Sequence, residues 1–251
     1  MTSLLIGATG YVGSFLSSKI DFDVKVHRSD IHSISGQSFD SLICAGLPAS
    51  KWLANSDPNK DFDNVKVLAK VLSTVSTKSA TLISTIDVYQ PPRSVCELDP
   101  ANLKGAEAYG VNRAWFEAQF LENFPFGKVI RLPGLYSRTL RKNLVFDLLN
   151  KRVDQLRSYS AFSEFQFMDL GELPRILSIT DEQNISLLNV TSEPVTAHQI
   201  AEVFGVLLEK TESFARYDVK TIHGSLFGTD SQYLFSNEEV IEGIRHLKEG
   251  Y

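Results

Sequence analysis

Seven residues near the start of the sequence combine small side chains with a spacing that suits phosphate binding. Gly7-Ala8-Thr9-Gly10-Tyr11-Val12-Gly13 follows an apolar run at Ser3–Ile6 and opens a helical pattern. Small residues let the backbone turn tightly against a pyrophosphate, and the helix N-terminus supplies N–H donors and partial positive charge. The alternative is a tight strand–helix turn that binds no nucleotide. A strand before the loop and a helix after it favour the dinucleotide site.

The elements that must position this loop alternate between short apolar runs and longer amphipathic patterns. The apolar runs predict strands at Ser3–Ile6, Val24–His27, Phe39–Ala45, Ala80–Thr85 and Lys128–Leu132. Helices are predicted between them, at residues 12–20, from Asp57-Pro58 to Leu72, and over Ala108–Asn123. This alternation predicts an α/β fold of the Rossmann type, with a doubly wound parallel sheet and right-handed crossovers.

Beyond Pro133 the pattern becomes less regular, and we expect a smaller α/β substrate lobe. Helices are predicted at Asn143–Leu149 and Gly171–Ile179, with extended segments at Phe165–Met168 and Ser186–Val190. Capping boxes predict two more helices, from Thr196 with Gln199 to Lys210 and from Ser236 with Glu239 to Glu249. We expect a dinucleotide-binding domain over residues 1–137 and the lobe over 138–251, with the strand near 186–190 returning to the first domain.

Composition excludes several classes of protein. The chain has 251 residues, of which 43% are hydrophobic and 22% charged, and it has no apolar run of about 18–20 residues that could span a membrane. A net charge of −5 disfavours nucleic-acid binding. The two cysteines form no disulfide framework, and neither they nor the five histidines have the spacing of metal ligands, so no metal is expected. The glycine loop begins at residue 7, which leaves no room for a secretion signal before it, and we expect a cytoplasmic protein.

Five further segments match a known pattern, in chain order. They are Asp63-Asn64-Val65 with Leu68, Ile83–Tyr89 (ISTIDVY), Tyr109–Arg113 (YGVNR) with Glu117, Arg131–Tyr136 (RLPGLY) and Asn143-Leu144. With the glycine loop, they resemble the NVxGTxxLL, SSxxVY, YGxSKxxxE, RpxNvYG and NL segments of the extended short-chain dehydrogenase/reductase family. That family includes nucleotide-sugar epimerases, dehydratases and ketoreductases. The matches run from residue 1 to about residue 200, so the resemblance implies the family's Rossmann fold.

The resemblance implies a role for each matching residue. Tyr109 would act as general acid/base on the substrate oxygen, Thr85 would hold that oxygen, and Asn64 would support the site. Residue 113 follows Tyr109 by one helical turn, on the same face. Cofactor contacts are implied at Gly7, Thr9, Gly10, Tyr11, Val12, Gly13, Arg28, Ser29, Ala45, Gly46 and Pro133. Substrate contacts are implied at Asp87, Arg141, Asn143 and Leu144.

Arg113 stands where the family has a lysine that lowers the pKa of the tyrosine and binds the nicotinamide ribose. The positive charge is retained, but a planar guanidinium does not have the geometry of a compact ammonium. Two hypotheses follow. The protein is either a working enzyme with adjusted geometry or an NADP-binding regulatory or scaffold protein with weakened catalysis. The retained Thr85 and Tyr109 favour the enzyme.

The residue after the second predicted strand distinguishes NADP from NAD. An acidic residue there would accept a hydrogen bond from the ribose 2′-OH of NAD. Arg28, beside Ser29, suits a 2′-phosphate and predicts NADP; the alternative is an NAD ribose held by Asp30. Only eleven residues separate Arg28 from Asp40, too few for a parallel crossover with its helix. We expect a strand fragment at His32–Ile34, and a shortened wall beside the adenosine that eases cofactor exchange.

Position 86 narrows the expected reaction. In the family's dehydratases an acid at this position protonates the departing hydroxyl, and Ile86 cannot do so. Reduction of a keto group on a nucleotide-activated sugar remains, with epimerisation as the alternative. Both reactions use the same Thr–Tyr–cation set, and an exchangeable NADP favours the reductase. The resemblance also implies a homodimer, formed through the helix of Tyr109 and the helix of Asn64.

Overall fold

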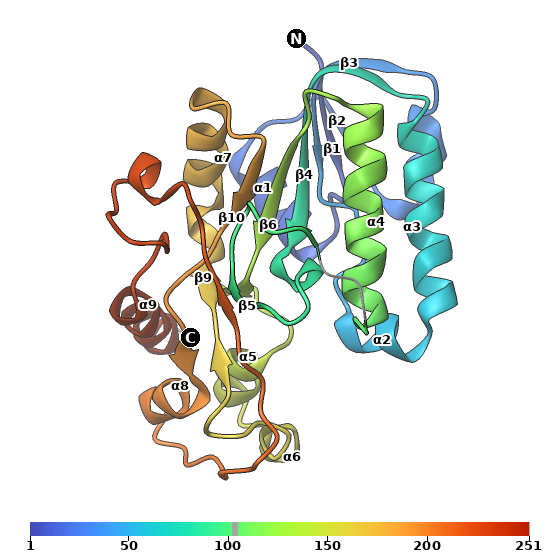
Figure 1. The fold of residues 1–251 in the computed structure, drawn as a ribbon. Helices are drawn as coiled ribbons and strands as arrows, with labels where there is room; N and C mark the ends of the chain where they lie inside the picture. The colour runs from blue at the N-terminus through green and yellow to red at the C-terminus, as the bar shows by residue number, and fades with distance from the viewer. Residues whose placement is uncertain (102–104, 251) are drawn as a thin grey trace. The chain divides into compact units, whose positions relative to one another are not determined.

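The computed structural model describes residues 1–101 and 105–250, which belong to two compact units (Figure 1). Unit 1 comprises Met1–Pro91, Pro100–Arg131 and Thr180–Leu188. Unit 2 comprises Pro92–Asp99, Leu132–Ile179 and Asn189–Tyr251. The chain therefore passes between the units several times. Within the described residues, no helix has both the length and the apolar character needed to cross a membrane.

A six-stranded sheet forms the centre of unit 1, in the order β10-β6-β4-β3-β1-β2. Its strands are β1 (Ser3–Ile6), β2 (Val24–Val26), β3 (Ser38–Cys44), β4 (Ser76–Thr85), β6 (Lys128–Leu132) and β10 (Leu187–Asn189). β1 pairs in parallel with both β2 and β3, and β3 pairs in parallel with β4. The carboxyl ends of these four strands therefore lie at one edge. The predicted Rossmann-type sheet is confirmed.

The sheet departs from the usual Rossmann order beside β2. That order places a third strand outside the second, whereas here β2 leads into a 3-10 helix, η1 (Arg28–Ile34), and then directly into β3. The predicted strand fragment at His32–Ile34 is wrong. The Asp30 carboxylate accepts a hydrogen bond from the His27 N–H at 2.8 Å, which starts a helical turn, and Ile31 and Ile34 are buried in the core. The prediction that the crossover between β2 and β3 is shortened is confirmed.

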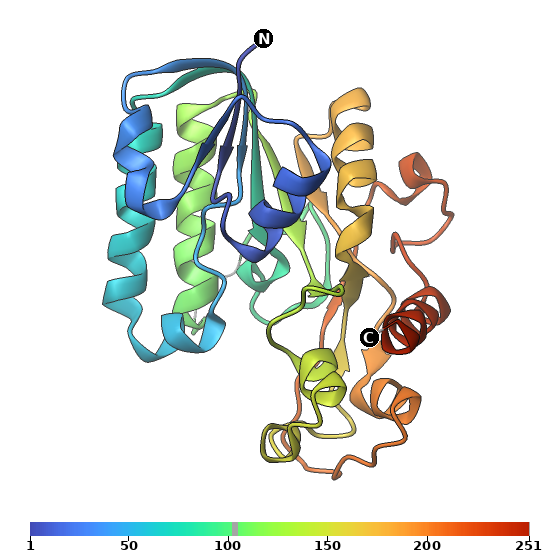
Figure 2. The same ribbon diagram turned by 180° about the vertical axis from the view of Figure 1, so that it is seen from behind.

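The α-helices that lie wholly within the described residues of unit 1 complete its layers. They are α1 (Tyr11–Lys19), α2 (Lys51–Ser56), α3 (Pro58–Leu72) and α4 (Ala108–Asn123). Figures 1 and 2 show α3 and α4 side by side on one face of the sheet and α1 on the other. The Asp57 carboxylate caps α3 by accepting from the Lys60 N–H at 3.2 Å, as the Asp57-Pro58 pair predicts. The short helix α2 had no counterpart in the sequence prediction.

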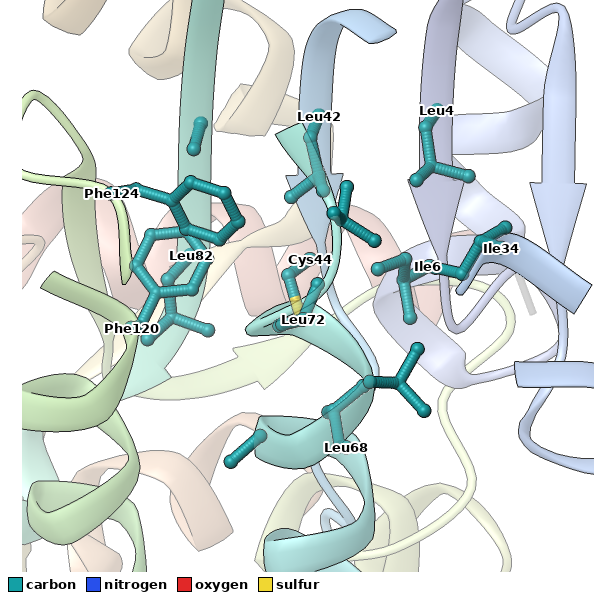
Figure 3. Close-up of a cluster of buried hydrophobic side chains, with 14 of the residues drawn as sticks. Leu4, Ile6, Ile34, Leu42, Cys44, Leu68, Leu72, Leu82, Phe120 and Phe124 are labelled. Carbon is teal, nitrogen blue, oxygen red and sulfur yellow. The ribbon is translucent and has the colours of Figure 1, made fainter. Parts of the chain in front are cut away.

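The core of unit 1 lies between the sheet and the pair α3–α4 (Figure 3). Leu42 and Cys44 of β3 are 1% and 0% exposed, in a cluster with Leu72 of α3. Phe120 of α4 and Phe124, which follows the last residue of the helix, reach the same cluster, with ring centroids 5.0 Å apart. This packing fixes the position of α4 against the strands that end at the candidate site.

Unit 2 is built from short elements. Its two-stranded sheets pair β7 (Gly134–Tyr136) with β9 (Phe167–Asp169), β8 (Glu164–Phe165) with β11 (Val195–Thr196), and β5 (Arg93–Val95) with β12 (Asp218–Val219). Its helical segments are α5 (Leu144–Leu149), α6 (Val153–Leu156), η3 (Leu170–Glu172), α8 (Ala197–Val203), η4 (Gly224–Phe227) and α9 (Asn237–Glu249). α7 (Leu173–Glu182) spans the boundary between the units.

The predicted end of the helix from Thr196 to Lys210 is wrong, because the helix stops earlier in the structure. Its capping box is present, with Thr196 and Gln199 bonded reciprocally, but α8 stops at Val203. Gly205 has φ +69°, and the N–H groups of Gly205 and Val206 bond back to Glu202 and Ala201. This glycine-terminated motif closes the helix about two turns early.

Candidate active site

The glycine loop connects β1 to α1 and depends on three glycines. Gly7 has φ +86°, and a Cβ there would lie 2.4 Å from the Ala45 carbonyl oxygen. A Cβ on Gly13 would lie 2.1 Å from the Gly7 carbonyl oxygen, so the first turn of α1 packs directly on the loop. Gly10 donates to the Gly7 carbonyl at 2.9 Å and occupies the N-cap of α1, where it has no side chain to cover the helix end. The loop therefore fits a pyrophosphate at a helix N-terminus.

The other residues of the predicted cofactor set in unit 1 surround this loop. Thr9 is exposed, while Tyr11 and Val12, which begin α1, are half-buried. Ala45 and Gly46 follow β3, beside the end of β1, and the Ala45 N–H donates to the Ile6 carbonyl at 2.9 Å. The ends of β1 and β3 thus meet at the loop.

Arg28 and Ser29 lie just past the end of β2 and are exposed. An Arg28 Nη donates a hydrogen bond to the Asn64 Oδ1 of α3. The Asp30 Oδ1 accepts from the His27 N–H at 2.8 Å and from the Ser29 hydroxyl at 3.4 Å. Asp30 therefore serves the η1 turn, while Arg28 remains at the edge of the sheet. Asn64, which the resemblance places among the supporting catalytic residues, contacts Arg28 here.

Tyr109 stands in the first turn of α4 and is held there by two neighbours. Its N–H donates to Asn55 Oδ1 of α2 at 2.9 Å. The next residue, Gly110, packs so closely on the turn after β4 that a Cβ would lie 2.2 Å from the Asp87 carbonyl oxygen. The side chain is 9% exposed, and this burial raises the pKa of the phenol to about 12, although the Arg113 charge opposes the shift. In the free protein Tyr109 is therefore a protonated phenol at neutral pH.

Arg113 is buried, with 1% of its side chain exposed, and forms an ion pair with Asp61 of α3, which is 6% exposed. Its two terminal nitrogens donate to both Asp61 carboxylate oxygens and to the Pro48 carbonyl, with a longer contact of 3.4 Å to the Tyr109 carbonyl. The guanidinium carbon lies 4.0 Å from the centroid of the Tyr109 ring. Arg113 thus fixes the ring, α3 and the loop after β3 together.

Thr85 ends β4 and bonds to the turn that follows it. Its hydroxyl accepts from the Asp87 N–H at 3.2 Å and lies 3.3 Å from Asp87 Oδ2. Asp87 in turn forms an ion pair with Lys51 of α2, whose Nζ lies 2.8 Å from Asp87 Oδ1 and 3.2 Å from Glu107 Oε2. The structure therefore brings a hydroxyl, a carboxylate and an ammonium to the turn on which the helix of Tyr109 packs.

A buried polar network holds the turn after β4 in place. Glu117 of α4 accepts a bidentate set of bonds from Arg131, the shortest at 2.6 Å, and one from the Ser84 hydroxyl at 2.5 Å. Arg131 also donates to the Tyr89 hydroxyl at 2.6 Å. These residues belong to the matched segments, and together they join β4, α4 and β6.

The remaining predicted residues belong to unit 2. Asn143 caps α5 by accepting from the Phe146 N–H, and its amide nitrogen donates to the Leu135 carbonyl at 2.8 Å. Leu144 is 1% exposed, Arg141 is exposed and Pro133 is buried. Both ends of the Asn143 amide are used within its own unit. The substrate contacts implied for Arg141, Asn143 and Leu144 stay predictions, as does the cofactor contact of Pro133.

Two charged residues of the site were missed from the sequence. Asp61 lies four residues before Val65 on the apolar stripe of α3, and an acidic residue on such a stripe signals a buried partner. Lys51 gave no signal, because it belongs to a six-residue helix without a clear pattern. Among the described residues, no group of three or more His, Cys, Asp or Glu side chains is arranged to hold a metal ion.

Solved structures of nucleotide-sugar enzymes share this architecture. A dTDP-4-dehydrorhamnose reductase from Yersinia enterocolitica gives a TM-score of 0.72 at 13% identity, covering 99% of both chains. MoeE5 in complex with UDP-glucose and NAD gives 0.76 at 12% identity, covering 99% of this chain and 98% of its own. RMD from Pseudomonas aeruginosa complexed with NADPH gives 0.69 at 14% identity, covering 100% and 99%. The chain has the fold of these enzymes. No family model and no curated protein sequence matches it.

Proposed function

We propose that the protein is an NADP-dependent oxidoreductase of the extended short-chain dehydrogenase/reductase family that reduces a keto group on a nucleotide-activated sugar. The observation that carries this proposal is the shared edge of four parallel strands. β1, β2 and β4 end there in the glycine loop, Arg28 and Thr85, and Gly110 packs the start of the Tyr109 helix on the turn after Thr85. Ligands of open α/β sheets bind outside this edge. The reductase and the UDP-glucose and NADPH complexes of the same fold support the choice of ligands.

The protonation state of Tyr109 favours reduction over epimerisation. The reduced nicotinamide, when bound, supplies the hydride for the carbonyl carbon. The Tyr109 hydroxyl then donates its proton to the carbonyl oxygen, while the Thr85 hydroxyl donates a hydrogen bond to the same oxygen. An epimerase must first remove a proton from a hydroxyl, which requires the phenolate. Burial raises the pKa of Tyr109 to about 12, so the proton donor is the form that the free protein presents.

Arg28 supports NADP as the cofactor. A guanidinium can pair with a 2′-phosphate, and its contact with Asn64 orients it from α3. Asp30, the alternative acceptor for an NAD ribose, already binds the His27 N–H. In this assignment Gly7, Gly10 and Gly13 hold the pyrophosphate and Arg28 with Ser29 holds the 2′-phosphate. Asn64 acts as a positioning residue for Arg28.

The second candidate is an NADP-binding regulatory or scaffold protein, and one observation favours it. The terminal nitrogens of Arg113 are bonded to Asp61, Pro48 and the Tyr109 carbonyl, and only its buried Nε lacks a partner among the described residues. The guanidinium therefore does not offer its terminal donors to a ribose as the family's lysine does. This candidate predicts tight NADPH binding without turnover.

Cofactor binding and turnover separate the two candidates. We expect NADPH to raise the melting temperature of the protein more than NADH, and we expect Arg28→Ala to remove that preference. With dTDP-4-dehydrorhamnose as the first substrate tried, we expect wild type to oxidise NADPH. Tyr109→Phe should abolish turnover and leave NADPH affinity unchanged. An equal response to both cofactors would refute the Arg28 assignment, and unchanged turnover in Tyr109→Phe would refute the proton donor.

We also propose a homodimer and a cytoplasmic location. Val67 of α3 and Leu121 of α4 are 44% and 39% exposed, and Phe62 and Trp115 pack edge to face on the same two helices, with centroids 4.9 Å apart. Such a partly apolar surface suits pairing of α3 and α4 with a second copy. Within the part of the chain that the structure describes, neither Cys44 nor Cys96 forms a disulfide, as a reducing compartment allows. Sedimentation of wild type and Leu121→Glu tests the dimer.

A further inference from the structure

A cavity of about 660 Å³ lies wholly within unit 2, where β7, β9 and α9 each form part of its wall. Residues of the segment 227–236, which precedes α9, form another part. Its volume is typical of cavities that hold small organic ligands. None of the described residues that line it belongs to the proposed catalytic, cofactor or substrate set. The proposed function therefore gives this cavity no role.

The wall of this cavity is strongly acidic. Among the described residues, five that line it are acidic and one is basic: Asp169, Glu172, Glu193, Asp230 and Glu239, against Arg175. The Arg175 Nε donates to Glu172 Oε2 at 2.8 Å, so this cation is already paired. The other four carboxylates have no basic partner in the described part of the chain. Such a wall repels phosphates and other anions and attracts cations.

Backbone N–H groups hold three of these carboxylates in fixed positions. Asp169 Oδ1 accepts from the Gly171 N–H at 2.8 Å, at the start of η3. Glu239 Oε2 accepts from the Ser236 N–H at 2.6 Å within the capping box of α9, and Glu193 Oε2 accepts from the first N–H of α9 at 2.9 Å. The second oxygen of each carboxylate has no hydrogen-bond partner within the described residues. These acceptors are therefore oriented before a ligand binds.

Tyr136 of β7 adds a hydroxyl without a partner to the acidic wall. The residue is 4% exposed and lines the cavity, and its hydroxyl forms no hydrogen bond with residues 1–101 or 105–250. Gly243 of α9 makes room for this hydroxyl, since a Cβ there would lie 2.1 Å from it. Burial raises the pKa of the phenol, and the charges of Asp169, Glu172 and Glu239 raise it further. An unpaired buried hydroxyl is costly. A ligand that donates hydrogen bonds would satisfy it together with the carboxylates.

The distribution of the charges favours an organic polycation over a metal ion. In the described ranges, no three of these carboxylates come close enough together to hold one ion. The lining also includes aromatic and aliphatic side chains, namely Phe167, Met168, Tyr233, Leu234 and Phe235. Aromatic faces attract ammonium groups, and apolar side chains cover methylene groups. Ammonium groups separated by methylene chains match both features of the wall.

We propose that this cavity is a binding site for a linear polyamine. Its ammonium groups would donate to the second oxygens of Asp169, Glu193 and Glu239 and to the Tyr136 hydroxyl, while its methylene groups would lie against the aromatic side chains. The site lies outside the proposed catalytic set. Its existence does not depend on the reduction of a keto-sugar.

Isothermal titration calorimetry of the full chain with spermidine tests the proposal. We expect saturable binding of one spermidine per chain. Asp169→Asn and Glu239→Gln should each weaken it about tenfold, because a hydrogen bond to a charged group is lost. Both variants keep the capping bonds, since an amide oxygen also accepts at these positions. Tyr136→Phe should weaken binding about tenfold without lowering the urea midpoint, because the hydroxyl has no partner within the described residues.

Glu242→Gln is the matched control for Glu239→Gln. Glu242 lies three residues further along α9, where it pairs with Arg245 and His246 and does not line the cavity. Both variants remove one negative charge from a chain of net charge −5, so a general attraction of polycations would weaken equally in both. We expect Glu242→Gln to bind spermidine as wild type does. Butylamine, which has a single ammonium group, should bind about a hundredfold more weakly than spermidine.

Three results would overturn the proposal. They are the absence of saturable spermidine binding at physiological ionic strength, an equal loss of affinity in Glu239→Gln and Glu242→Gln, and Mg²⁺ that binds as tightly as spermidine and displaces it. If Glu239→Gln does not fold by circular dichroism, Asp169→Asn carries the same comparison. Since no lining residue belongs to the catalytic set, a protein that reduces no keto-sugar would refute the proposed function and still leave the polyamine site to be decided by calorimetry.

Discussion

Replacing Asp61 by asparagine should destabilise unit 1 far more than the same change two residues away. Asp61 is 6% exposed and pairs with Arg113, which is 1% exposed. Asp63 is 69% exposed and pairs with Lys66 at 2.7 Å on the same helix. Both substitutions remove one negative charge from an ion pair of α3. They differ in whether the remaining cation is buried or can return to water.

The magnitude follows from that difference. Removing one partner of a buried ion pair costs about 3–5 kcal/mol, because the other charge stays buried without compensation. An exposed pair contributes about 0–1 kcal/mol. Asp61→Asn also weakens the bond that Asp61 Oδ2 accepts from Asn112 at 2.8 Å. We therefore expect a loss of about 3–5 kcal/mol for Asp61→Asn and less than about 1 kcal/mol for Asp63→Asn.

Tryptophan fluorescence during urea unfolding measures this loss. The two tryptophans, Trp52 and Trp115, both lie in unit 1, so the signal reports on the unit that contains the pair. With a slope of about 3 kcal/mol per molar urea, the midpoint should fall by about 1–2 M for Asp61→Asn. Asp61→Asn combined with Arg113→Met should be more stable than Asp61→Asn alone, because no unpaired charge remains. Equal midpoints for Asp61→Asn and Asp63→Asn would refute the reasoning.

Three further predictions concern Arg113, Tyr109 and the cysteines. Arg113→Lys introduces the lysine of the family that the sequence resembles. It should lower both turnover and the urea midpoint, because one ammonium cannot reach both Asp61 oxygens and the Pro48 carbonyl; a faster enzyme would contradict this. Since the pKa of Tyr109 is raised to about 12, its contribution to folding is complete below the ordinary value of about 10 and is lost as the pH rises from there through 12. Tyr109→Phe should therefore lose less unfolding free energy than wild type over that range, and equal losses would argue against the shift. Cys44 is 0% exposed and its burial raises the thiol pKa to about 12, so a thiol reagent should modify only Cys96 in the native protein, and rapid reaction of both would contradict the core position of Cys44.

The sequence predicts unit 1 well because its elements are long and periodic. The helix at Ala108–Asn123 and the strand at Lys128–Leu132 have the predicted bounds. The apolar run at Phe39–Ala45 corresponds to the parallel strand β3 (Ser38–Cys44), which lies between β4 and β1 inside the sheet. Between β2 and β3 the chain is too short for the usual crossover helix and strand. The number of residues there predicts that these elements are missing, but it does not predict the 3-10 helix that replaces them. The 3-10 helix at Arg28–Ile34 depends on the hydrogen bond from the His27 N–H to the Asp30 carboxylate, and hydrophobic periodicity does not predict such a contact.

Unit 2 could not be assembled from the sequence for a different reason. Its strands have two or three residues, too few for an alternating pattern. β5 and β12 pair although Arg93 and Asp218 lie far apart in the chain. Local capping signals at Thr196 and Ser236 are correct, yet the stop at Gly205 was missed because a capping box marks only the start of a helix.

The candidate site shows the same division between local and distant contacts. Thr85, Tyr109 and Arg113 lie in matched segments and could be named from the sequence. The partners that define their chemistry, Asp61 and Lys51, come from α3 and α2 and touch the site only after folding. A sequence therefore indicates which side chains carry the chemistry, whereas the folded chain determines the charges that act on them.

Transfer of deuterium from labelled NADPH to dTDP-4-dehydrorhamnose tests the central proposal most directly. The label sits on the nicotinamide carbon that delivers hydride, and mass spectrometry follows it into the sugar. We predict a reduced product that carries the deuterium with wild type, and no labelled product with Tyr109→Phe although NADPH still binds. NADPH bound by wild type without label in any keto-sugar product would contradict the account and favour a binding protein. Label exchanged into a sugar without net oxidation of NADPH would contradict it in favour of an epimerase.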